Sequence, residues 1–340
     1  MAPDAHNAAT LARVLKGFGL GSSRRVRRLH AGTGSTAKFI IEAREHADDA
    51  APDRLFLKRR PRTEQAIAEA LAQHGVRAHL ADAGLPVQRP IRTREGGTLL
   101  LGPDGAYELS PFVDAERWTP APPRARAAGR TLRDLHDALE AVRGSTPDGL
   151  RLSTPFAEQE DDPDLLGFRA DDGSEAGFLL GSRADAAARV RGRLPADNQI
   201  IHGDFHPGNT RWEGDRLVAV LDFDACRVGS ALEEAALASV HFGLDRSARS
   251  MASRSPWPDP AIIEAFWEGY GGVRAGPDAA RLTPWLAVGA FATEALRGMR
   301  EGSFSDDTVA FASGVVAWIV DHADGLGEIL ARLSPPAEPG

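Results

Sequence analysis

The first third of the chain consists of short apolar runs separated by turn residues, a pattern typical of a small β-sheet. Five strands are predicted, at residues 27–30, 38–42, 55–58, 98–101 and 107–110. A glycine-rich turn over residues 31–36 joins the first two strands. Residues 62–83 are rich in helix formers and end at Gly84 and Pro86, which stop a helix. We therefore expect a small sheet with one helix across it.

After Pro111 the spacing of apolar residues changes from that of strands to that of helices. Between residues 125 and 142, Leu132, Leu135 and Leu139 fall on one helical stripe. Two further long helices are predicted at residues 281–299 and 306–332. The second part of the chain is therefore expected to be mostly helical.

The segment 153–194 is rich in Asp, Glu, Gly and Arg, and we expect it to form a mobile or helical insertion. The last residues combine proline and glycine with the chain end, which is typical of a disordered tail. The whole pattern predicts an α+β protein. Its expected parts are an N-terminal lobe (1–110), a helical C-terminal lobe (111–333) and a tail (334–340).

The composition is that of a soluble globular protein, with 42% hydrophobic and 26% charged residues. A formal net charge of −8 argues against nucleic acid as the main partner, because a polyanion would be repelled. Cys226 is the single cysteine, so no internal disulfide can form. No uncharged apolar run approaches the ~20 residues needed to cross a bilayer, and no secretion signal is visible. We expect a cytoplasmic protein without a membrane partner.

The stretch from Gln199 to Asp224 carries the clearest chemical signal. His202, Asp204 and Asn209 stand at the spacing of the kinase catalytic loop, H-R-D-x-x-x-x-N. Asp222 follows at the end of the next apolar strand, where kinases place a metal-binding aspartate. The two elements support each other, and together they predict phosphoryl transfer.

Phosphoryl transfer explains why these residue types are needed. A carboxylate must orient the attacking hydroxyl and accept its proton, and Asp204 suits that task. Magnesium prefers oxygen ligands, so Asn209 and Asp222 are predicted to bind it beside the phosphates of ATP. Asp224 lies two residues after Asp222 and could also reach the metal.

The strings HGDFHPGN and VLDFDACR resemble the catalytic region of the aminoglycoside phosphotransferase, choline kinase and homoserine kinase superfamily. The resemblance extends over about residues 25–245. It implies a bilobal protein-kinase-like fold, with a small antiparallel sheet and one helix in the N-lobe and a mostly helical C-lobe. It also implies ATP and Mg²⁺ as cofactors.

The same resemblance implies roles for residues outside the catalytic loop. Lys58 corresponds to the phosphate-binding lysine of the third strand, and Glu69, in preference to Glu64, is its expected ion-pair partner. His206 is expected to touch the γ-phosphate, and Glu234 to brace the catalytic loop. The stretch Gly32 to Ser35 resembles the phosphate-covering loop, and residues 108–112 are expected to offer backbone groups to adenine. The nucleotide contacts implied in this way are Gly32, Gly34, Ser35, Glu108 and Phe112.

The acceptor is expected to be a small molecule. Only eight residues, Phe223 to Ser230, separate Asp222 from a helical composition, which leaves little chain to hold a peptide. The acceptor hydroxyl could belong to an aminoglycoside-like antibiotic, an amino alcohol, an amino acid or a sugar. The acidic run at 158–164 is compatible with an amine on that molecule.

Two other functions fit parts of the sequence. His202, Asp204 and His206 alternate, so a strand would point all three the same way as ligands of a zinc-dependent metallohydrolase. A nucleotide-binding pseudokinase that acts as an interaction module is the third hypothesis. Its support is the lack of an obvious helix glutamate to pair with Lys58.

Overall fold

A computed structural model of the chain describes residues 5–20, 23–29, 36–43, 54–141, 174–195, 197–245 and 250–336. These residues form two compact units. The first ends at Glu116 and takes in Ala219–Asp224, a segment expected in the helical lobe; the second comprises the other residues from Arg117 onward. The segment belongs to the first unit because the amide N–H of Val220 donates to the carbonyl of Pro86 and Val220 forms a parallel bridge with Val87.

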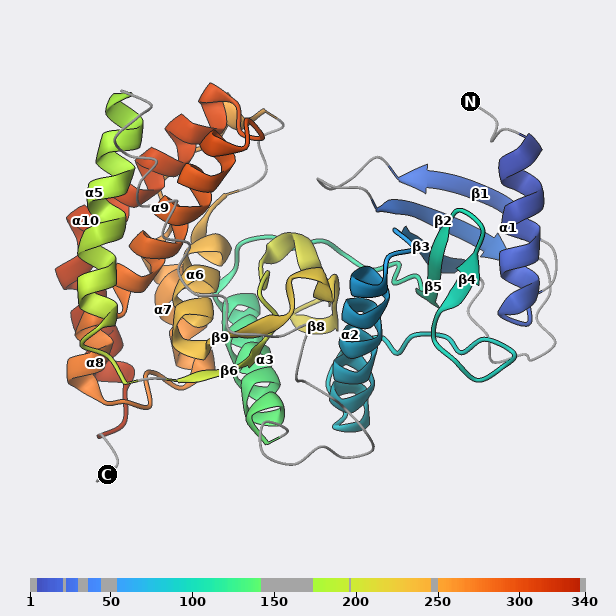
Figure 1. The fold of residues 1–340 in the computed structure, drawn as a ribbon. Helices are drawn as coiled ribbons and strands as arrows, with labels where there is room; N and C mark the ends of the chain where they lie inside the picture. The colour runs from blue at the N-terminus through green and yellow to red at the C-terminus, as the bar shows by residue number, and fades with distance from the viewer. Residues whose placement is uncertain are drawn as a thin grey trace. The chain divides into compact units, whose positions relative to one another are not determined.

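The first unit contains the predicted small antiparallel sheet (Figure 1). Its strand order is β1-β2-β3-β5-β4, and every neighbouring pair is antiparallel. The strands are β1 (Ser23–Leu29), β2 (Ala37–Ala43), β3 (Arg54–Arg60), β4 (Leu100–Gly102) and β5 (Gly105–Pro111). All five lie at or within a few residues of the predicted positions.

Two helices cover opposite faces of this sheet (Figure 1). Helix α2 (Glu64–Asp82) is the predicted one, and Thr63 caps it by accepting a hydrogen bond from the amide of Ala66. Helix α1 (Ala5–Gly17) was not predicted. It packs on the apolar face of the sheet, in a core formed by Val14, Leu15, Phe18, Ile41, Leu55, Leu57, Tyr107 and Leu109. The opposite face is left for polar residues.

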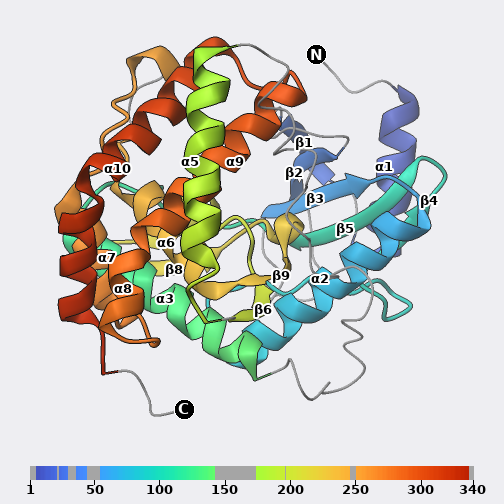
Figure 2. The ribbon, with the colours of Figure 1, turned by 60° about the vertical axis from the view of Figure 1, so that its left-hand side comes forward.

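The second unit is mostly helical, as predicted. Its described helices of more than one turn are α3 (Pro122–Glu140), α5 (Glu175–Arg191), α6 (Ala231–Gly243), α7 (Pro260–Tyr270), α8 (Pro277–Leu282), α9 (Pro284–Arg300) and α10 (Asp306–Leu333). Helices α5, α9 and α10 pack side by side (Figure 2). Helices α3 and α7 cross very closely, because a Cβ on Gly129 would lie 1.9 Å from the carbonyl oxygen of Phe266. Glycine is therefore required at that crossing.

Helix α10 is, within the described part of the chain, the one helix whose length and composition would let it cross a membrane. A buried helix of a soluble protein passes the same test, and α10 packs against α8 and α9.

Directly after α10, the hydroxyl of Ser334 accepts a hydrogen bond from the amide of Val273 at 2.9 Å and donates one to the carbonyl of Leu330 at 2.7 Å. Order therefore extends into the predicted tail, of which residues 337–340 lie outside the described residues.

Candidate active site

The second unit presents the catalytic-loop motif directly after a short strand. Strand β6 (Asn198–Ile201) pairs with β9 (Arg227–Ser230), and the loop begins at His202. Gly203 has φ +81°, and a Cβ there would lie 2.0 Å from the carbonyl oxygen of Ala225. Glycine is needed for both reasons. The second residue of the motif is thus fixed by backbone geometry.

A buried carboxylate holds this loop from behind. Glu234, on α6, accepts hydrogen bonds from the backbone N–H groups of His202 and Gly203. It also contacts Nε2 of His136 at 2.8 Å, and His136 in turn contacts the hydroxyl of Tyr270 at 2.8 Å. Burial raises the pKa of Glu234. The hydrogen bond from His136 and the other donors lower it by a larger amount, so the net shift of the pKa is downward. Glu234 therefore braces the loop as an ionised group, in the place where the resemblance implied a brace.

Glu234→Gln is expected to lower the free energy of unfolding by about 1–3 kcal/mol, because an amide cannot replace all the charge-assisted bonds of a buried carboxylate. Urea denaturation at neutral pH measures the change. The matched control is Glu233→Gln: Glu233 is partly exposed and pairs with Arg191 at the surface, so its loss is expected to stay below about 0.5 kcal/mol.

The same brace predicts a pH dependence. Because the folded-state pKa of Glu234 is lowered, its stabilisation is fully present above the unfolded-state pKa of about 4.3 and is lost as the pH falls below it. Wild-type protein is therefore expected to lose more stability than Glu234→Gln between pH 6 and pH 3. Equal acid sensitivity of the two proteins would contradict an ionised Glu234.

The catalytic loop brings Asp204, Asn209 and His206 together. The side-chain amide of Asn209 donates to the carboxylate of Asp204 at 2.8 Å and to its carbonyl oxygen at 2.9 Å. Nδ1 of His206 accepts from the amide of Gly208 at 3.0 Å, and its Nε2 lies 3.4 Å from the Asp204 carboxylate. The Asp204 side chain is half exposed, so it is both held in place and accessible.

His202 does not belong to this accessible group. It is 1% exposed, and its Nδ1 accepts a hydrogen bond from the amide of Asp204. Nδ1 of His206 is likewise occupied by a backbone amide of the loop. The zinc trio of His202, Asp204 and His206 is therefore not supported, because the two imidazoles stabilise the loop instead of converging on one point. In the described part of the chain, no group of three or more His, Cys, Asp and Glu residues is arranged to bind a metal.

The first unit brings the predicted lysine and the predicted metal aspartate together. Lys58 on β3 is 3% exposed, and its ammonium lies 3.1 Å from the carboxylate of Asp222, which is 164 residues away in sequence. It also forms a close ion pair with Asp224. Arg60 binds Asp224 from the other side at 2.5 Å. The polar face of the sheet thus carries a cluster of paired charges.

Asp222 adopts an unusual backbone conformation. Its φ of +61° is in the left-handed region, and it is the one residue other than glycine with positive φ in the described ranges. Burial raises the pKa of Asp222, but the ammonium groups of Lys58 and Lys38 lower that pKa by more. The carboxylate is therefore ionised, and the local strain is retained at a residue predicted to bind a metal.

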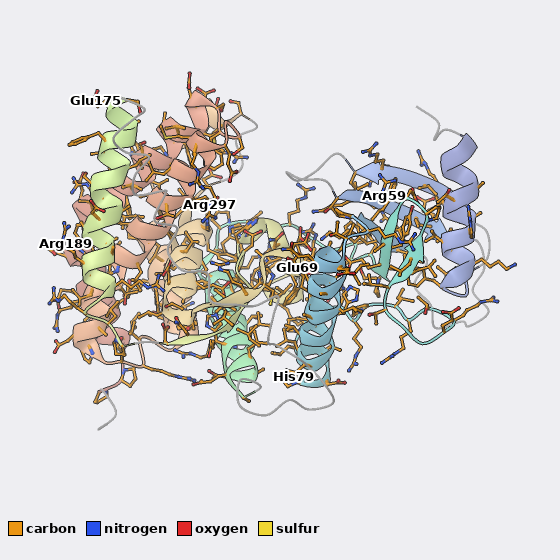
Figure 3. All side chains as sticks on the ribbon, in the orientation of Figure 1. Arg59, Glu69, His79, Glu175, Arg189 and Arg297 are labelled. Carbon is orange, nitrogen blue, oxygen red and sulfur yellow. The ribbon has the colours of Figure 1, made fainter. Side chains whose placement is uncertain are left out.

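The ion pair predicted between Lys58 and Glu69 does not form. Glu69 lies in the N-terminal half of α2 (Figure 3) and accepts a hydrogen bond from Gln65 at 2.9 Å. The turn of α2 beside the charged cluster is the next one, about 6 Å further along the helix axis. There Gln73 donates to the carbonyl oxygen of Asp224 and accepts from Arg60.

Glu108 takes the position beside Lys58 that Glu69 was expected to fill. It stands directly opposite Lys58 in the pairing of β3 with β5, with 4.0 Å between the charged groups, and it also binds Arg60 at 3.2 Å. His74 makes a close hydrogen bond to it. Burial raises the pKa of Glu108, but the His74 hydrogen bond and the Arg60 charge lower it by a larger amount, so the net shift of the pKa is downward. Its side chain is therefore part of the charge cluster, a role that sequence reasoning missed.

The remaining nucleotide contacts fare differently. The amide N–H of Phe112 donates to the carbonyl oxygen of Arg54 at 2.9 Å, and the Arg54 guanidinium lies over the Phe112 ring. That N–H is therefore engaged in pairing with β3, and a contact of Phe112 with the nucleotide stays a prediction. Gly32, Gly34 and Ser35 lie outside the described residues.

Comparison with families gives one match across most of the chain: a family model described as "Phosphotransferase enzyme family" matches residues 25–285. Curated relatives include homoserine kinases from Zymomonas mobilis, 29% identical over 150 residues, and Rhizobium etli, 31% identical over 158 residues. These alignments cover 43% and 44% of this chain, and 45% and 46% of the respective relatives. The chain thus spans less than half the length of the curated relatives it matches.

Solved structures resemble the chain over nearly its whole length. A spectinomycin phosphotransferase bound to ADP and spectinomycin has a TM-score of 0.64 at 12% identity, covering 96% of this chain and 98% of that one. An amicoumacin kinase bound to AMP-PNP and Ca²⁺ has a TM-score of 0.65 at 15% identity, covering 95% and 93%. At these identities the likeness establishes the fold, which is the predicted protein-kinase-like one.

Proposed function

Since this chain belongs to the phosphotransferase enzyme family, we propose that it is a kinase that transfers the γ-phosphate of ATP to a hydroxyl group of a small molecule. The observation that carries the proposal is the cluster in which buried Lys58 meets Asp222 and Asp224. A lysine and two carboxylates brought together from such distant parts of the sequence match the phosphate and metal requirements of phosphoryl transfer.

Each unit supplies part of the chemistry. In the second unit, Asp204 is the group that orients the acceptor hydroxyl and takes its proton, and the hydrogen bond from Asn209 fixes the carboxylate for that task. In the first unit, Lys58 binds phosphate oxygens. Asp222 and Asp224 provide hard oxygen ligands that suit Mg²⁺, and Asn209 of the catalytic loop stays a predicted metal ligand. Bound Mg²⁺ would supply charge neutralisation of the phosphate oxygens.

The acceptor is proposed to be a compact hydroxyl compound. Support comes from the short connection between Asp222 and α6, where the 3₁₀ turn Phe223–Ala225 and strand β9 leave no long segment for a peptide. The relatives act on an amino acid, homoserine, and two similar folds bind spectinomycin and hygromycin B. Amino acids, amino alcohols, sugars and aminoglycoside-like antibiotics are therefore the classes to test. A cytoplasmic location fits such substrates.

A screen of such hydroxyl compounds for substrate-dependent ADP release tests the proposal directly. The screen should contain homoserine, spectinomycin and hygromycin B, with generic protein substrates and labelled ATP in a parallel assay. Release of ADP with one small compound is the expected result. Efficient labelling of proteins together with no small acceptor would contradict it.

Lys58→Ala is expected to raise KM for ATP by about 10- to 100-fold, because charge-assisted bonds of about 1.5–3 kcal/mol to phosphate are lost. KM for the acceptor is expected to change much less. Steady-state kinetics with each substrate varied in turn measures both values. Lys16→Ala, at an exposed position of α1, is the matched control. An equal rise in both KM values, with unchanged thermal unfolding, would contradict a phosphate-binding Lys58.

A further inference from the structure

Lysine is rare in this chain. Of the 40 Lys and Arg residues, three are lysines: Lys16, Lys38 and Lys58. Two of the three lie in the charge cluster of the first unit, where both donate to Asp222: Lys38 at 3.0 Å and Lys58 at 3.1 Å. A protein that uses arginine nearly everywhere else keeps compact ammonium groups at this one place. An ammonium is a compact point charge, whereas a guanidinium is a planar fork.

The two lysines are direct neighbours across strands. Lys38 on β2 is the register partner of Lys58 on β3, and Lys58 is the register partner of Glu108 on β5. The three residues therefore form a row on one face of the sheet. Opposed residues on antiparallel strands have Cβ atoms about 5 Å apart, and like charges placed there destabilise the sheet. Such a pair persists when an anion lies between the two charges.

In the free protein that anion is Asp222. The side chains of Lys38 and Lys58 are 17% and 4% exposed, so water screens little of their mutual repulsion. The cluster contains three carboxylates and four cationic groups. The carboxylates are Asp222, Asp224 and Glu108, and the cations are Lys38, Lys58, Arg60 and Arg77. A divalent cation on Asp222 would leave this cluster with a larger excess of positive charge. An anionic ligand would restore the balance.

We propose that Lys38 is a second phosphate-binding residue, which shares the phosphate chain of the nucleotide with Lys58. The inference rests on the proposed function, since it assigns a further ligand to the same site. In the free protein both ammonium groups hold Asp222. With metal and nucleotide bound, Asp222 would hold the metal, and both ammonium groups would be available to bind phosphate oxygens. The resemblance to known kinases assigned this task to Lys58 alone.

The scarcity of lysine makes a direct test feasible. An acyl phosphate of ATP carries a reactive carbonyl at the end of its phosphate chain. A lysine amine beside that chain attacks the carbonyl, the new amide bond replaces the carbonyl–phosphate bond, ATP leaves and the amine proton passes to solvent. Peptide mass mapping then reports on Lys16, Lys38 and Lys58 separately. Lys16 lies on α1, at the opposite face of the sheet, and is an internal control.

Labelling of Lys38 and Lys58 that excess ATP suppresses is the expected result, with Lys16 at background. Lys58→Arg removes one amine and keeps the charge, and Lys38 should still be labelled in that variant. Labelling of Lys58 without Lys38 would overturn the inference and leave the proposed function intact, because Lys38 would then be a counter-ion of Asp222 alone. Labelling of neither lysine would overturn the proposed function itself.

Binding measurements give a second readout. Lys38→Ala is expected to weaken binding of ADP and ATP by about 10-fold, the effect of one charge-assisted hydrogen bond, and to leave adenosine binding unchanged. Isothermal titration calorimetry measures all three affinities. A similar loss for adenosine would show that Lys38 supports the sheet and does not contact phosphate, and it would overturn the inference.

Discussion

Asp204→Asn is expected to reduce turnover by about 100- to 10,000-fold, the usual contribution of a positioned general base. The asparagine side chain keeps the shape of the aspartate and can still accept the hydrogen bond from Asn209. What it loses is the ability to take a proton from the acceptor hydroxyl. Nucleotide affinity is expected to remain close to that of wild type, because Asp204 acts on the acceptor.

Single-turnover kinetics with a saturating acceptor, together with calorimetric binding of ADP, separates these two effects. The matched control is Asp215→Asn, because the carboxylates of Asp204 and Asp215 are 50% and 64% exposed and lie in the same unit. Turnover of the control should equal that of wild type. A catalytic rate near wild type in Asp204→Asn would remove Asp204 from the role of base.

Asp222→Asn is expected to weaken Mg²⁺-dependent ATP binding by more than about 100-fold, since the loss of even a supporting group around a metal costs roughly 10- to 100-fold. The variant also leaves Lys38 and Lys58 without their shared carboxylate. Asparagine is among the residues that tolerate positive φ, so the backbone at +61° is not further strained. The effect can therefore be assigned to the lost charge.

ATP titrations with and without Mg²⁺ measure the metal-dependent part of the affinity. Asp104→Asn is the matched control, because Asp104 is a carboxylate of the same unit that pairs with Arg59 at 2.9 Å, outside the charge cluster. Figure 3 labels Arg59 on the sheet. Identical Mg²⁺ dependence in Asp222→Asn and wild type would exclude Asp222 as a metal ligand.

Local signals in the sequence predicted the catalytic loop well. Its residues are adjacent in the chain, and Gly203 is required by its own φ, so the motif can be predicted without any tertiary contact. The strands and α2 were found for the same reason. Strand β3 is followed by Pro61, β4 and β5 end at Gly102 and Pro111, and α2 ends two residues before Gly84.

Helix α1 was missed although it carries a local signal: Leu11, Val14, Leu15 and Phe18 recur at the i, i+3, i+4, i+7 spacing of a helical stripe, and all four pack in the sheet core. The pairing of Glu108 was missed because it has no such signal. Glu108 is an acidic residue in an apolar strand, and its role depends on the register that places it opposite Lys58. Register between strands that are about 50 residues apart in the chain is decided by tertiary packing, and a linear pattern does not encode it.

The charge cluster of the first unit has a consequence for biosynthesis. The apolar core around α1 and the sheet is complete once residue 109 has left the ribosome, since its members lie between Val14 and Leu109. Lys38 and Lys58 cannot yet pair with Asp222 at that stage, because Asp222 is synthesised more than a hundred residues later. During that interval the nascent sheet carries two adjacent ammonium groups with Glu108 beside Lys58 but without the carboxylates of Asp222 and Asp224. Domains usually fold as units during synthesis, in order from the N-terminus; here the N-terminal unit can complete its polar face only after translation has passed through the catalytic loop.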